Sequence, residues 1–185
     1  DFMCHNLGAD VSADPFTPSA SIQGAKYQWG ATTGMANRYI SQMDDQNPAY
    51  AYIAGWNQVN LPDNTWQDAV KTANDPCPAG YRVPTSAQWQ GVINNNAITR
   101  LGTWTGGYTS AIKFGPSLLL PATGFRSATA GAGLQSVGSD AYYWSSTKYT
   151  GPEPQDAIAL FLSISSSMVY HIGRINGTPV RCISE

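Results

Sequence analysis

The sequence has few charged side chains and no excess of positive charge. Charged residues make up 12% of the 185 positions, and the net charge is −2, whereas about 25% charged residues is ordinary for a soluble domain. A chain without a basic excess has no electrostatic attraction for nucleic acid or for an anionic membrane surface. We therefore expect no nucleic-acid partner, and solubility that depends on neutral polar side chains.

Long hydrophobic runs are also missing. No apolar segment approaches the ~20 residues that a membrane-spanning helix needs, so we expect no membrane insertion by this chain. No signal peptide is recognisable, and the abrupt opening "DFMCHNLGAD" leads us to expect that a leader or a preceding domain has been removed. The length fits one domain, residues 1–185, which we expect to belong to a longer surface protein.

Side chains that carry acid–base chemistry are scarce. The chain has two histidines, His5 and His171, and two glutamates, Glu153 and Glu185. Paired-carboxylate hydrolysis needs two well-placed acids, and the adjacent pair Asp44–Asp45 is interpreted as a solvated turn. The G-x-S-x-G elbow and the phosphate-binding P-loop motif are both absent. The sequence predicts a protein that is not an enzyme, although counting alone does not exclude a Ser-His-Asp arrangement.

The three cysteines are too few and too widely spaced for a zinc ribbon or a thioredoxin-type site. Their odd number leaves at least one thiol unpaired or paired outside the chain. Cys4 beside His5 is a weak metal-binding pattern, and we expect Cys4 to be a small buried residue. Cys77 lies in the extended stretch "DPCPAGYRVP", which gives a thiolate little stabilisation. A reactive thiol and a structural bond both remain open for Cys77.

Local patterns predict short helices in the first half of the chain. "KYQW", residues 26–29, is a candidate strand, and a turn and a brief helix are expected in residues 30–40. Residues 64–75 are a helix candidate, because their apolar side chains recur at three- and four-residue spacing, at Trp66, Ala69, Val70 and Ala73. A second helix is expected to begin after Thr85, which has Gln88 three positions later in a capping-box pattern.

Short apolar runs separated by turn residues predict strands from Leu101 onward. These runs are "PSLLLPATGF", "DAYYWSST", "AIALFLS", "SSMVYHI" and "TPVRCIS". "SATAGAGLQSVGSD" between two of them is expected to be a flexible loop. We expect Trp144 to pack in the core with its indole hydrogen-bonded. Helices first and strands later predict an α+β domain with a twisted, mainly antiparallel sheet.

Six motifs in order resemble the Fibrobacter succinogenes major paralogous domain family. They are "FMCHNLGAD", "KYQWGATTGM", "CPAGYRVPTSAQWQGV", "LLLPATGFR", "YYWSSTKY" and "PVRCIS", and they extend from Phe2 to Ser184. The chain departs from the family pattern at His5 and Asn6, where an acidic residue and Asn are often found, and in the aromatics at Tyr81 and Phe125. None of these differences breaks the order of the motifs.

The resemblance implies a C-type-lectin-like fold and an exported or surface protein of Bacteroidetes-type bacteria. Related domains occur at pilus tips and among targets of diversity-generating retroelements, where the segment after the Trp-Ser-Ser-Thr motif is the diversified ligand face. In such a fold the last strand returns beside the first elements, which implies a disulfide between Cys77 and Cys182. A Cys4–Cys77 pair and three free thiols are the alternatives.

The resemblance also raises the question of calcium. "GPEPQDA" places Glu153, Gln155 and Asp156 where sugar-binding C-type lectins carry calcium ligands. Calcium needs six to eight oxygen ligands, and Asn176 stands without the Asn-Asp pair of those lectins. We therefore expect a plain polar turn and no cofactor, with calcium as the less favoured alternative.

The segment from Lys148 to Gly177 is rich in Tyr, Ser and Gly, side chains that antibody paratopes use for adaptable contacts. Strand alternation puts Met168, Tyr170 and Ile172 on one face. Together with the family resemblance, this composition predicts a cell-surface adhesin-like or lectin-like domain that binds a protein or glycan on a cell or host surface. The expected contacts are Tyr149, Gln155, Asp156, Ser167, Tyr170, His171, Arg174 and Asn176. The alternatives are a structural module of a pilus or surface protein, and an enzyme related to the formylglycine-generating enzymes.

Overall fold

Helices are few and short in the computed structural model, which describes residues 1–185. The helices are α1 (Gln42–Asp45), α2 (Ser86–Asn95) and the 3-10 helices η1 (Ala20–Ile22), η2 (Pro48–Tyr50) and η3 (Ala128–Ala130). None of them is long and apolar enough to cross a membrane. Twelve short strands form four sheets, so the expected α+β class with mainly antiparallel pairing is confirmed.

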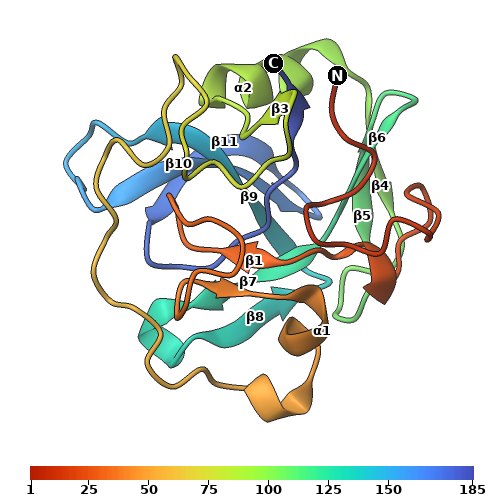
Figure 1. The fold of residues 1–185 in the computed structure, drawn as a ribbon. Coiled ribbons are helices and arrows are strands. Elements are labelled where there is room, and N and C mark those ends of the chain that lie inside the picture. The colour runs from red at the N-terminus through yellow and green to blue at the C-terminus, as the bar shows by residue number, and fades with distance from the viewer.

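The largest sheet has five strands and contains most of the late part of the chain (Figure 1). Its strands are β7 (Thr123–Ser127), β8 (Gly133–Val137), β9 (Asp140–Lys148), β10 (Asp156–Ser163) and β11 (Ser167–Gly173), in the order β11-β10-β9-β7-β8. All neighbours are antiparallel except β7 and β9, which meet in parallel at Gly124 and Ala141. Because β11 ends the order, one side of its backbone has no strand partner.

Three smaller sheets surround the large one. They contain β1 (Lys26–Tyr27) paired with β2 (Tyr39–Ile40), β3 (Tyr81–Arg82) paired with β12 (Ile183–Ser184), and β4 (Ile98–Leu101), β5 (Ala111–Phe114) and β6 (Leu118–Pro121) in sequence order. The strand expected at residues 26–29 and the strands expected in the late part of the chain are thus present.

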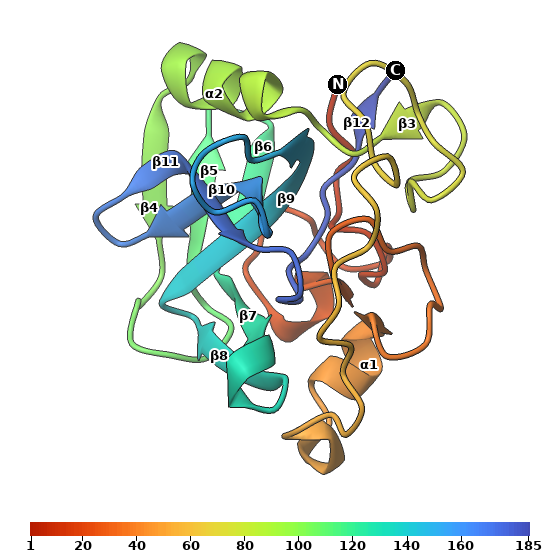
Figure 2. The ribbon, with the colours of Figure 1, turned by 90° about the vertical axis from the view of Figure 1, so that its left-hand side faces the viewer.

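Helix α2 begins with the predicted capping box. The Thr85 hydroxyl accepts a hydrogen bond from the Gln88 N–H at 3.1 Å, and the Gln88 side chain accepts one from the Thr85 N–H at 2.8 Å. These bonds satisfy two N–H groups that have no partner inside the helix. Trp89 and Val92 are buried in a cluster with residues of β9 and β10. Figure 2 shows α2 at the top of the molecule, above the strands.

The helix predicted for residues 64–75 is wrong, because this segment forms only turns and bends. Only one side chain of its expected apolar face is buried. Trp66 is 1% exposed, whereas Val70 is 54% exposed. Side-chain donors take carbonyl groups that a helix would have used: Arg82 Nη2 donates to the carbonyls of Gln67 at 2.9 Å and Asp68 at 2.6 Å. Such bonds offer the backbone an alternative to the helical ladder.

Two other segments also differ from expectation. Residues 30–40 contain turns and β2 but no helix, and the short helix α1 follows at Gln42. The predicted flexible loop over residues 127–140 contains η3 and strand β8, which pairs with β7. The turn between them is built on left-handed backbone at Gly131 and Ala132, with φ of 63° and 56°. The Gly- and Ala-rich sequence thus forms a tight return rather than an irregular loop.

The disulfide between Cys77 and Cys182 is confirmed. The two residues are 105 positions apart, and their Cα atoms are 5.8 Å apart, within the range for a bridged pair. The bond lies beside the β3–β12 pair, and both chain ends come to this side of the molecule (Figure 1). It answers the question left open for Cys77, whose sulfur is not a free nucleophile. Cys4 is free and exposed, so its expected burial is wrong.

Indole N–H groups join the parts of the core. Trp29 donates to the carbonyl of Ser145 at 2.9 Å, Trp89 to the carbonyl of Trp144 at 3.1 Å, and Trp144 to the carbonyl of Tyr27 at 2.7 Å. Trp144 is 0% exposed, so its predicted place in the core is confirmed. Each bond satisfies the polar atom of a large apolar ring, so the ring can be buried without losing a hydrogen bond.

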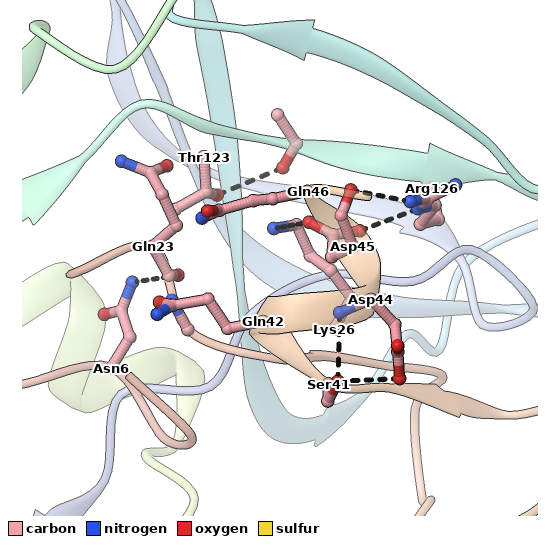
Figure 3. Close-up of polar contacts among 12 residues, drawn as sticks. Asn6, Gln23, Lys26, Ser41, Gln42, Asp44, Asp45, Gln46, Thr123 and Arg126 are labelled. Carbon is pink, nitrogen blue, oxygen red and sulfur yellow. Dashed lines mark hydrogen bonds and ion pairs between the residues drawn. The ribbon is translucent and has the colours of Figure 1, made fainter. Parts of the chain in front are cut away.

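A buried ion network joins β1, α1 and β7 through Lys26, Asp45 and Arg126 (Figure 3). The Asp45 carboxylate accepts hydrogen bonds from Lys26 Nζ at 3.0 Å and from Arg126 Nε at 2.7 Å. All three side chains are at most 3% exposed. This corrects the expectation of a solvated turn at Asp44–Asp45, because the second carboxylate is the buried counter-ion of two cations. A buried ion pair needs such additional hydrogen bonds to compensate for lost hydration.

Candidate functional site

Segment 148–177 forms the edge of the large sheet and the turns at one of its ends. It comprises the end of β9, the turn over residues 149–155, strands β10 and β11, and the loop over residues 174–177. The predicted contact residues lie on these elements, but their side chains have different surroundings. Some are free at the surface, some are hydrogen-bonded to one another, and others hold neighbouring loops.

Six aromatic side chains follow one another across this part of the molecule; we call them the aromatic series. The rings in order are Tyr149, His171, Tyr170, Phe161, Tyr142 and Phe125, with successive centroid distances of 4.1, 4.9, 6.5, 4.9 and 5.3 Å. They come from the residue after β9 and from β11, β10, β9 and β7. Cross-strand aromatic pairs of this kind stabilise a sheet and stiffen its surface.

The edge strand β11 presents part of the aromatic series to solvent. Tyr170 is 48% exposed and Met168 is 43% exposed, whereas Val169 packs on the cluster beneath α2. The alternation expected for this strand therefore holds for these three residues. Ile172 departs from it, because its side chain packs against the cluster that contains the disulfide. The outward face is therefore limited to the first part of β11.

A polar cleft of about 280 Å³ lies at the other end of β11. We call it the amide cleft, because four of its lining residues carry primary amides. Its polar side chains are Gln58, Asn60, Thr129, Gln155, Asp156 and Asn176. Gln155, Asp156 and Asn176 were predicted as contacts, so the fold brings three of the predicted residues together.

Asp156 and His171 form a hydrogen-bonded pair across β10 and β11. The Asp156 carboxylate accepts from His171 Nδ1 at 2.7 Å, and the ring of Tyr149 stacks on the imidazole. Asp156 is 8% exposed, so the pair holds the carboxylate at the wall of the cleft. In many hydrolases an imidazole in this arrangement is the general base, and the carboxylate is the residue that orients it. His171 makes no hydrogen bond to a hydroxyl or a thiol.

Arg174, one of the expected contacts, has a side chain that is already hydrogen-bonded within the protein. It is 7% exposed, and its guanidinium donates to Asp63 Oδ1 at 2.8 Å and to the carbonyl of Pro154 at 3.0 Å. Lys148 contacts the same carboxylate at 2.7 Å. Hydrogen bonds from Lys148 and Arg174 lower the pKa of Asp63 below its ordinary value. Arg174 thus attaches the loop around Asp63 to the end of β11.

Asn176 and Ser167 also have structural partners. The Asn176 side chain accepts from the Ala128 N–H and donates to the carbonyl of Gly173, both at 3.0 Å. The Ser167 hydroxyl accepts a long hydrogen bond of 3.4 Å from Arg100. Gln155 is exposed, and its side chain makes no hydrogen bond within the protein. Among the predicted contacts, Gln155 and Tyr170 are therefore the most open to a partner.

Nothing gathers around Glu153, Gln155 and Asp156 that resembles a calcium cage. No group of three or more His, Cys, Asp or Glu side chains converges anywhere in the chain. Asp156 is the only carboxylate that lines the amide cleft. A ligand set of six to eight oxygens would need carbonyl groups and water to supply nearly all of it.

Several residues of this region were not found by sequence reasoning. Gln58 and Asn60 come from the segment between η2 and β3 and belong to no motif, and Asn60 Nδ2 donates to the carbonyl of Gln155 at 3.3 Å. Phe125, Tyr142 and Phe161 join the aromatic series through strand register, which composition does not reveal. Comparison with family models, with curated proteins and with solved structures finds no match to this chain.

Proposed function

We propose that this chain is a non-enzymatic recognition domain that binds a ligand through the edge of its large sheet. The observation that carries the proposal is the aromatic series, whose member Tyr170 is half exposed and lies two positions from the exposed Met168 on β11. Exposed aromatic and methionine side chains on a rigid surface are typical of binding sites. Tyr residues of this kind often supply most of the energy of an interface.

We infer further that the domain belongs to the Fibrobacter succinogenes major paralogous domain family and has a C-type-lectin-like fold. Support comes from the six ordered motifs between Phe2 and Ser184 and from the α+β architecture. The bond between Cys77 and Cys182 also fits the return of the last strand that the resemblance implies. The Trp-Ser-Ser-Thr motif, which ends directly before segment 148–177, fits the same family pattern.

We place the protein outside the cytoplasm, secreted or attached to the bacterial surface or a pilus. A disulfide persists in oxidising compartments and is rare in the cytosol. The low charged fraction of 12% is in keeping with exported β-rich proteins. Fractionation of the native bacterium with an antibody to this chain would test this placement, and recovery in the cytosolic fraction would contradict it.

Binding to cells tests recognition directly. Beads coated with the protein should adhere to at least one member of a panel of host and bacterial cells. The double variant Met168→Ala/Tyr170→Ala should reduce adhesion tenfold or more, because truncating a central anchor costs about 2 kcal/mol or more. Circular dichroism should show an unchanged fold, since both side chains are about half exposed.

A matched control removes the same side-chain types elsewhere. Met43 is 78% exposed and Tyr52 is 73% exposed, and neither belongs to segment 148–177. Met43→Ala/Tyr52→Ala should adhere as the unmodified protein does. Equal loss in both double variants would contradict the proposed face. Adhesion to no cell type would contradict recognition itself and favour a structural module of a pilus or surface protein.

A further inference from the structure

The amide cleft has hydrogen-bonding capacity that the protein itself does not use. Asp156 gives one carboxylate oxygen to His171, and its second oxygen, Oδ1, has no partner. The side-chain oxygens of Gln58 and Asn60 accept no hydrogen bond, and the whole amide of Gln155 is free. Primary amides both donate and accept, while a carboxylate only accepts. The cleft therefore matches a ligand whose groups can do both.

The walls of the cleft are held in place before any ligand arrives. Asn176 is bonded on both sides, to Ala128 and to Gly173. The carbonyl of Ile175 accepts hydrogen bonds from the indole of Trp56 at 2.8 Å and from Gln28 at 2.9 Å. His171 orients the Asp156 carboxylate. A site fixed in this way loses little conformational entropy on binding.

The lining also restricts the chemical class of the ligand. No lysine or arginine lines the cleft, and Arg174 beside it is occupied by Asp63 and by backbone carbonyls, so an anion finds no counter-charge. A single carboxylate is a poor site for a metal ion. Only two lining residues, Ala128 and Ile175, are apolar, which is too little apolar surface for a hydrophobic ligand. A volume of about 280 Å³ lies just below the ~300–1,000 Å³ typical of ligand sites, which fits one small unit.

From these features we infer that the amide cleft binds one uncharged sugar unit of a glycan, without a metal ion. Vicinal hydroxyl groups donate to Asp156 Oδ1 and to the amide oxygens of Gln58 and Asn60, and they accept from the free amide of Gln155. The inference rests on the proposed recognition function and gives it a ligand class. The cleft lies at the Gly173 end of β11 and Tyr170 in the middle of the strand, so the rest of a glycan chain can extend from the cleft along the edge strand.

The test uses neutral monosaccharides as probes: glucose, galactose, mannose, fucose and N-acetylglucosamine, each at millimolar concentration, with and without EDTA. Side-chain amide signals are followed in two-dimensional ¹H–¹⁵N spectra of the whole chain. At least one sugar should shift the signals of Asn60 and Gln155 in a saturable manner. Asp156→Asn and Gln155→Ala should each weaken binding of that sugar about tenfold or more, because the first removes the charge of the acceptor and the second removes the hydrogen-bonding amide.

Gln155→Ala is the decisive variant, since its side chain supports nothing in the fold. Gln90→Ala is the matched control: this exposed glutamine on α2 bonds only to Asn94, and its loss should leave sugar binding unchanged. No shift with any sugar, a shift that Gln155→Ala leaves intact, or a shift that EDTA abolishes would each overturn the inference.

Cell adhesion separates this inference from the recognition function. Periodate oxidation of cell-surface glycans should abolish adhesion of the coated beads if a sugar is the ligand. Adhesion that survives periodate, and still depends on Met168 and Tyr170, would overturn the sugar assignment while supporting recognition of a protein.

Discussion

Arg174 and Asp63 join two segments that are 111 positions apart, through a hydrogen bond of 2.8 Å from Nη1 to Oδ1. The guanidinium also lies 5.3 Å from the ring centroid of Trp29. We predict that Arg174→Ala lowers the free energy of unfolding by about 2–3 kcal/mol, because charged hydrogen bonds and packing are lost together. Urea denaturation, monitored by tryptophan fluorescence, measures this change in the free energy of unfolding.

Lys148 provides the control for this prediction, since it contacts the same carboxylate from the surface. Lys148→Ala should cost less than about 1 kcal/mol, as exposed ion pairs usually do. Equal stability of Arg174→Ala and the unmodified protein would show that Arg174 is a free surface side chain after all.

The bond between Cys77 and Cys182 closes a loop of 105 residues. Replacing both cysteines with alanine should lower the free energy of unfolding by about 4–5 kcal/mol, because the unfolded chain regains the entropy of an open loop. Replacing the exposed Cys4 with serine should leave stability nearly unchanged. Thermal unfolding with and without a reducing agent gives a second readout, and insensitivity to reduction would refute this role.

Asp45 is the only counter-ion of the buried Lys26 and Arg126. We predict that Asp45→Asn destabilises the protein by about 3–5 kcal/mol, since it leaves two buried cations without a negative charge. The neighbouring variant Asp44→Asn, at a partly exposed carboxylate that accepts from Ser41, should cost less than about 1 kcal/mol. Chemical denaturation measures the free energy of unfolding of both variants. Similar losses of stability in Asp45→Asn and Asp44→Asn would contradict the prediction.

Burial raises the pKa of Tyr27 well above its ordinary value of 10. Above pH 10 the unfolded chain therefore loses this proton while the folded protein keeps it, and stability falls as the pH rises. The free energy of unfolding of Tyr27→Phe should fall less steeply between pH 10 and 12 than that of the unmodified protein. Near pH 8 the variant should be less stable by about 1 kcal/mol, because the hydrogen bond to Thr33 is lost.

Arg181 has the opposite effect on alkaline stability, because burial lowers its pKa to about 10. Arg181 is present in both the unmodified protein and Tyr27→Phe, so its contribution cancels when the two pH dependences are compared. Urea midpoints at several pH values give the two slopes, and parallel slopes would contradict the assignment to Tyr27.

Local chemistry made part of this structure predictable. The capping box at Thr85 and Gln88 needs only residues three positions apart, and it forms as expected. The apolar runs from Leu118 onward became strands because turn residues bound them on both sides. The Cys77–Cys182 pair followed from a family resemblance and not from spacing, since three cysteines allow several pairings.

Contacts between distant segments were not predictable from the sequence. Arg126 reaches Asp45 across 81 positions, and Asn60 reaches the carbonyl of Gln155 across 95. Such contacts depend on strand register and on the path of loops, which no short pattern encodes. The same reason applies to Arg174, an expected ligand contact whose hydrogen bond to Asp63 spans 111 positions.

Hydrogen exchange of the backbone amides, with and without a captured cell-surface ligand, tests recognition at the sheet edge most directly. Strand β11 is an edge strand, so its unpaired amides exchange readily until a partner covers them. We predict that the ligand slows exchange in residues 155–176 and leaves α2 and β4 unchanged. Slowed exchange elsewhere, with residues 155–176 unaffected, would contradict recognition by this face.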